Sequence, residues 1–85
     1  RQQLAPHKRQ ADQLEQALST LHTQLAIVEA ALGDSALYEA SQKDQLRKQL
    51  DAQAKLKVRE AELEEQWMAA LEQLEALEQQ LAQAD

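Results

Sequence analysis

The sequence predicts an all-α protein, a two-helix antiparallel coiled-coil hairpin with a short helical turn at its tip. Three observations predict this fold. Ala, Leu, Glu, Gln and Lys dominate the 85 residues, as is typical of long helices. Apolar residues recur in alternating steps of three and four along two long segments. The single glycine, Gly33, separates these segments, so we expect the chain to double back there.

The first helix is expected at about residues 6–32, a length of roughly 40 Å at 1.5 Å per residue. Pro6 suits the first helical turn, where its missing N–H leaves no hydrogen bond unmade. Gly33 suits the C-cap, because glycine enters the left-handed backbone region at little cost. All but one of the seam positions are apolar: Leu4, His7, Ala11, Leu14, Leu18, Leu21, Leu25, Val28 and Leu32.

A turn is expected at residues 33–41, in which Asp34 or Ser35 caps a short helical stretch. Ser41 is then the predicted N-cap of the second helix, with Asp44 as the acid of a capping box.

The second helix is expected at about residues 42–83. Polar residues occupy its seam near residues 49–57, and Leu50 falls one residue beyond the seam, so we expect the weakest packing there. Residues 75–85 overhang the first helix in the expected hairpin, and Leu77 and Leu81 would need cover from elsewhere. The seam is Leu46, Gln49, Gln53, Leu56, Glu60, Leu63, Trp67, Ala70, Leu74, Leu77, Leu81 and Ala84.

Folding back at Gly33 also predicts which seam residues meet. The expected pairs are Leu32 with Leu46, Leu18 with Glu60, Leu14 with Leu63, and Ala11 with Trp67. The last pair places the smallest seam residue against the largest, which conserves volume across that layer as close packing requires. Glu60 is either a buried acid or leans outward so that its aliphatic stem covers the seam.

Several kinds of chemistry are not expected in this chain. The absence of cysteine excludes disulfides and Cys-based zinc sites, and no apolar run approaches the roughly 18 residues of a membrane span. His7 and His22 lie about four turns apart on one helix, so they cannot share a metal. His22 is one turn from Ser19, but no third group in the sequence orients it. We therefore expect no catalytic, cofactor-binding or metal-binding residues here.

Charge is segregated along the second helix. Residues 43–59 carry a net charge of +4, whereas residues 60–85 carry eight acids and no base, and the whole chain has a net charge of −6. The basic run is the candidate nucleic-acid-binding segment, because phosphate attraction drives such binding. Tyr38 is also a candidate contact, because its aromatic ring could stack on a nucleobase. The candidate residues are Tyr38, Lys43, Arg47, Lys48, Lys55, Lys57 and Arg59.

The alternative is that this basic run is only a solvated helix face. Asp44 with Lys48, and Asp51 with Lys55, are favourable i,i+4 pairs worth about 0.2–0.5 kcal/mol each. On a helical wheel Lys48, Lys55 and Arg59 share one outward face, while Lys43, Arg47 and Lys57 lie elsewhere.

Two stretches resemble a known family. The turn reads Leu32-Gly33-Asp34-Ser35-Ala36-Leu37-Tyr38, and a late Trp stands in Trp67-Met68-Ala69-Ala70-Leu71-Glu72-Gln73-Leu74-Glu75. With Pro6 entering the first helix, this pattern resembles the C-terminal domain of ABC-F ATPases, and within them the YheS-like branch. The resemblance extends from Pro6 to about Glu75.

This resemblance implies that the chain is the C-terminal coiled-coil domain of a larger cytoplasmic protein, an expectation consistent with its start at Arg1. That parent would have two ATP-binding cassettes, which would hold ATP and magnesium. ABC-F proteins act on ribosomes, and the C-terminal domain of the related Uup branch binds DNA. The implied partners are therefore nucleic acid (DNA or rRNA), the ribosome and the cassettes.

A second hypothesis is a purely structural or protein-interaction coiled coil, either a spacer or a dimerisation arm that uses Leu77 and Leu81. We expect no membrane partner, and a monomer or weak dimer for the isolated domain.

Overall fold

A computed structural model describes residues 3–84 of the chain. Its elements are α1 (Leu4–Leu32), the 3₁₀ turns η1 (Ser35–Tyr38) and η2 (Ala40–Gln42), and α2 (Lys43–Gln83). The molecule measures 69 × 15 × 15 Å, and the described residues include no strand. The predicted all-α class and the helical hairpin are confirmed.

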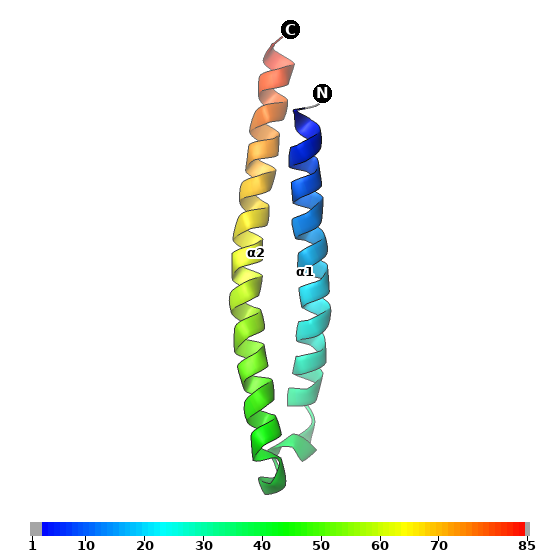
Figure 1. The fold of residues 1–85 in the computed structure, drawn as a ribbon, viewed down its shortest axis with the longest axis vertical. Helices are drawn as coiled ribbons and strands as arrows, with labels where there is room; N and C mark the ends of the chain where they lie inside the picture. Colours follow the sequence, from blue (N-terminus) through cyan, green and yellow to red (C-terminus); the bar gives the residue numbers. More distant parts are fainter. Residues whose placement is uncertain (1–2, 85) are drawn as a thin grey trace.

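The two long helices lie side by side and run in opposite directions, so the start of α1 and the end of α2 lie at the same end of the rod (Figure 1). At the other end, α2 begins beyond the last residue of α1, Leu32 (Figure 1). The first turns of α2 therefore lie next to η1, which contacts both helices.

One narrow seam between the helices forms the core. Leu18, Leu21 and Leu63 make a buried cluster, and their exposed fractions are 7%, 4% and 3%. No side chain of the described chain is completely buried, because each helix has only one neighbour. Partly buried side chains surround the cluster: Leu14, Ala17, Leu56 and Trp67.

The predicted register is wrong by about one helical turn. His22, rather than Leu18, makes the close contact with Glu60, and Leu63 joins Leu18 and Leu21 in the central cluster. The cause lies in the turn: because α2 starts beyond the end of α1, each α1 residue faces a later residue of α2 (Figure 1).

The predicted volume match of Ala11 with Trp67 depended on that register. Trp67 packs against the Leu18–Leu21–Leu63 cluster. Ala11 is buried, and so is Ala70 of α2. Two small residues in the seam allow the helix backbones to approach closely near the start of α1.

Gly33 does not adopt the left-handed conformation that the sequence suggested. Its φ is −82° and its ψ −8°, which continues the right-handed helix, and its N–H donates to the carbonyl of Glu29 at 3.0 Å. The chain direction changes at Asp34 and Glu39, which are both extended. Two extended residues, each followed by a 3₁₀ turn, make the reversal without a positive φ.

Of the two predicted capping residues at the turn, Asp34 caps a helix and Ser41 does not. Asp34 caps η1 as expected, since its Oδ1 accepts from the N–H of Ala36 at 3.0 Å. Ser41 is not the N-cap of α2. It lies inside η2, which leads directly into α2, and the N-cap residue Gln42 makes no side-chain capping bond.

The stretch expected to pack poorly does so. Leu50, which follows the seam position Gln49 in sequence, is 49% exposed, and the seam positions Gln49 and Gln53 are only half-buried. Near the far end of α2, Leu77 and Leu81 are also half-buried. None of the helices formed by residues 3–84 contains a stretch long and apolar enough to cross a membrane.

Candidate nucleic-acid interface

The six predicted cations all lie on the first half of α2, and all are exposed. They extend over roughly 24 Å of helix, from Lys43 to Arg59, at 1.5 Å per residue. Tyr38 lies separately in η1, next to the start of α2, and its side chain is also exposed.

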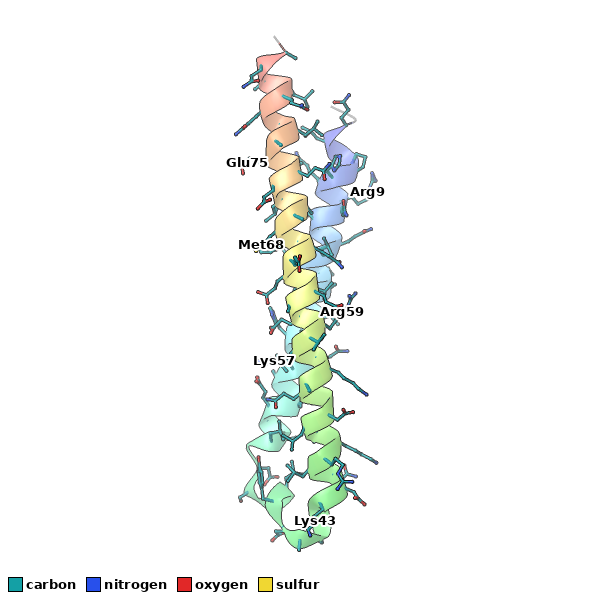
Figure 2. The ribbon with its side chains drawn as sticks, turned by 90° about the vertical axis from the view of Figure 1, so that its left-hand side faces the viewer. Arg9, Lys43, Lys57, Arg59, Met68 and Glu75 are labelled. Carbon is teal, nitrogen blue, oxygen red and sulfur yellow. The ribbon has the colours of Figure 1, made fainter. Side chains whose placement is uncertain are left out.

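These cations do not form one compact patch. Residues seven and four apart share a face of a helix, so Lys48, Lys55 and Arg59 form one group, the 48/55/59 face. Lys43 and Lys57 lie on another side of α2, with Arg47 beside them. Figure 2 shows Lys57 and Arg59 on opposite sides of the helix. A flat polyanion can therefore contact only one group at a time.

Two of the cations are paired with acids of the same helix. Lys55 Nζ lies 3.0 Å from Asp51 Oδ2, as the sequence predicted. Arg59 Nη1 lies 3.7 Å from Glu62 Oε1. Within residues 3–84, no acid lies within 4 Å of the charged groups of Lys43, Arg47, Lys48 or Lys57.

The tip of the hairpin carries charges of both signs, since Lys43 also lies at that end of the rod (Figure 2). Asp34 and Glu39 line a shallow depression there, together with Ala31, Ala36, Leu37 and Gln42.

Tyr38 is anchored rather than loose. Its hydroxyl donates to the backbone carbonyl of Leu32 at 2.6 Å, which satisfies one of the carbonyls that the end of α1 leaves without a helical partner. The side chain nevertheless remains 58% exposed. A ring that is held at one end and exposed on its surface can stack on a planar ligand.

The structure also brings together two residues that the sequence did not pair. His22 Nε2 lies 2.9 Å from Glu60 Oε2, across the two helices. The side chain of Glu60 is 20% exposed, whereas that of His22 is 56% exposed. The signal in the sequence was the acid on an apolar seam, which needs a polar partner. Identifying that partner requires the relative register of the two helices, and the register predicted from the sequence was wrong by about one turn.

A shallow groove runs between the helices beside this pair. Leu18 and Trp67 supply its apolar surface, and Trp67 Nε1 is buried without a hydrogen-bond partner among the described residues. Ser19 and His22 both border the groove, but no hydrogen bond joins them. The remaining lining residues are Glu15, Thr23, Ala26 and Glu64.

The arrangement of His22 and Glu60 can fix the relative position of the helices. In the described part of the chain, no three His, Asp or Glu side chains gather in a group that could hold a metal ion. Comparison of the chain with protein-family models, with curated proteins and with solved structures found no match.

Proposed function

We propose that this chain is an accessory arm of an ABC-F-type ATP-binding protein of the cytoplasm. In this role it either binds nucleic acid, DNA or rRNA, or positions the ATPase on the ribosome. The proposal rests on the resemblance of the turn and the Trp67 segment to that family. The observation that supports the nucleic-acid contact is the group of six exposed cations on the first half of α2.

The 48/55/59 face is the proposed contact. Its three cations project from one side of α2, so they can touch one phosphate backbone together. The acids beside Lys55 and Arg59 do not prevent this, because exposed ion pairs contribute only about 0–1 kcal/mol and phosphates can replace them. Tyr38 would add stacking on an unpaired base.

Titration with DNA and RNA at several salt concentrations tests this function. A protein that neutralises phosphates with three cations loses affinity with rising salt, with a logarithmic slope of about −3. Binding that does not change with salt, or no binding to either nucleic acid, would contradict the proposal.

Matched variants locate the contact. Lys48→Gln, Lys55→Gln and Arg59→Gln together should weaken binding and flatten the salt slope. Lys43→Gln, Arg47→Gln and Lys57→Gln change the net charge equally on another side of α2 and should leave most of the affinity. Equal losses in both triple variants would show that the net charge of the segment, and not this face, attracts the nucleic acid.

In the same domain, we propose that the helices pack as an antiparallel coiled coil with knobs-into-holes contacts. The heptad spacing and the cluster of Leu18, Leu21 and Leu63 support this packing. A crystal structure tests it: Leu63 should insert between four side chains of α1, and helices that only touch along ridges would contradict it.

The second candidate function is a structural or protein-interaction arm that binds no nucleic acid. The net charge of −6 and the ion pairs of Lys55 and Arg59 favour it. Titration of the chain with the separate ATP-binding cassettes distinguishes this role: it predicts binding to the cassettes and none to DNA or RNA.

A further inference from the structure

A second line of residues runs along α2, away from the seam with α1. It consists of residues 43, 50, 57, 61, 68 and 75, which are seven or four apart and so share one face of the helix. We name this line the outer stripe. Two large apolar side chains on it face solvent, since Leu50 is 49% and Met68 57% exposed. Figure 2 shows Lys57, Met68 and Glu75 along the same side of α2.

The outer stripe is symmetric about position 59. In one direction it reads Lys43, Leu50, Lys57, and from the other end it reads Glu75, Met68, Ala61 at the same spacing. A second copy laid across it in the opposite direction therefore brings Lys43 opposite Glu75 and Leu50 opposite Met68, while Lys57 lies opposite the small Ala61.

We propose that the outer stripe of α2 binds a second copy of this chain, antiparallel, about a twofold axis at position 59. Leu50 then faces Met68 of the second copy, and Lys43 faces its Glu75. Each of these contacts occurs twice, as a twofold interface requires.

Charge complementarity selects this orientation. Residues 43–59 have a net charge of +4, and residues 60–85 carry only acids. The antiparallel arrangement places the basic half of each α2 against the acidic half of the other. A parallel arrangement would oppose cation to cation and acid to acid, which is unfavourable.

Side chains that flank the stripe reinforce the same register. Lys43, Arg47 and Leu50 border one shallow depression on α2, and Glu64, Met68 and Glu72 border another. In the proposed dimer these two depressions face each other. Arg47 lies beside Glu72 of the second copy, and Lys57 lies one turn from its Glu64.

The dimer is a weak one. Its apolar contacts come mainly from two Leu–Met pairs, and the net charge of −6 on each copy opposes association. This inference does not rest on the proposed nucleic-acid contact, because the 48/55/59 face lies on another side of α2.

A charge-exchange experiment tests the ion pairs. Lys43→Glu and Glu75→Lys are each expected to abolish the concentration-dependent rise in mass in sedimentation of the 85-residue chain. An equimolar mixture of these two variants restores every pair in a heterodimer, so its mass should rise again. The double variant in one chain should also recover. Lys48→Glu, on the other face, is the control and should self-associate like the unmodified chain.

Cysteine cross-linking tests the register, and the chain contains no natural cysteine. Leu50→Cys and Met68→Cys are made separately and treated with a short bis-maleimide. The mixture should give several-fold more cross-linked dimer than either variant alone. A mixture that gives no more cross-linked dimer than the separate variants, or a strictly monomeric unmodified chain at about millimolar concentration, would overturn the proposal. Circular dichroism confirms that each variant keeps its helices, so a loss of association is not a loss of folding.

Discussion

Glu60 of α2 and His22 of α1 meet across the helix seam, with 2.9 Å between Oε2 and Nε2. The contact explains how an acid is accommodated in an otherwise apolar seam. The carboxylate and the imidazole lie close enough to interact directly, and both side chains keep some access to water. The pair also marks the register, because these side chains can meet only when the helices are correctly aligned.

A double-mutant cycle measures the strength of this contact. Since His22 is more than half exposed, we expect a coupling energy of about 0.3–1 kcal/mol between His22→Ala and Glu60→Ala in urea unfolding. The pair of His22 with Glu64, which also borders the groove, is the control and should couple more weakly. No coupling between His22 and Glu60 would contradict the register described above.

Leucines of α2 should differ sharply in their contribution to stability. Leu63 is 3% exposed in the central cluster, so Leu63→Ala should cost about 2–4 kcal/mol of unfolding free energy. Leu50 is 49% exposed, and Leu50→Ala should cost less than about 0.5 kcal/mol in the monomer. Both are measured by chemical unfolding at low protein concentration, and similar costs for the two would contradict the assigned seam.

Gly33 should tolerate a side chain. Its φ of −82° is accessible to every residue, and a Cβ at this position would meet only the carbonyl oxygens of Glu29 and Ala30 at 3.5 Å, ordinary van der Waals contacts. Gly33→Ala should raise stability by about 0.4–1 kcal/mol, because it restricts the unfolded chain. Thermal unfolding checks this, and a loss above about 1 kcal/mol would indicate a left-handed residue at the turn.

Tyr38→Phe should weaken the turn. The substitution removes the hydrogen bond from the hydroxyl to the Leu32 carbonyl but keeps the exposed ring. We expect a loss of about 0.5–1.5 kcal/mol in unfolding free energy. Amide hydrogen exchange gives the more specific readout, since faster exchange should be confined to η1 and the last turn of α1. An unchanged exchange pattern would show that this bond contributes little.

The candidate interface illustrates what a helical wheel can establish. Because α2 is one continuous helix, the spacing of Lys48, Lys55 and Arg59 sufficed to place them on one face and Lys57 on another. The same local rule predicted the pair of Lys55 with Asp51. The anchoring of Tyr38 on Leu32 depended on how the turn folds.

Local sequence determined the helical class and the reversal between two long helices, because heptad spacing and backbone propensity act within a few residues of the chain. It also identified the leucines of the seam and the poorly packed stretch around Leu50. Only the tertiary structure decided the register, and with it the contact of His22 with Glu60 and the position of Trp67. The physical reason is that a leucine seam repeats nearly identically at each turn. The relative shift of the helices is therefore set by the path of residues 33–42, where Gly33 stays helical and the chain bends at Asp34 and Glu39.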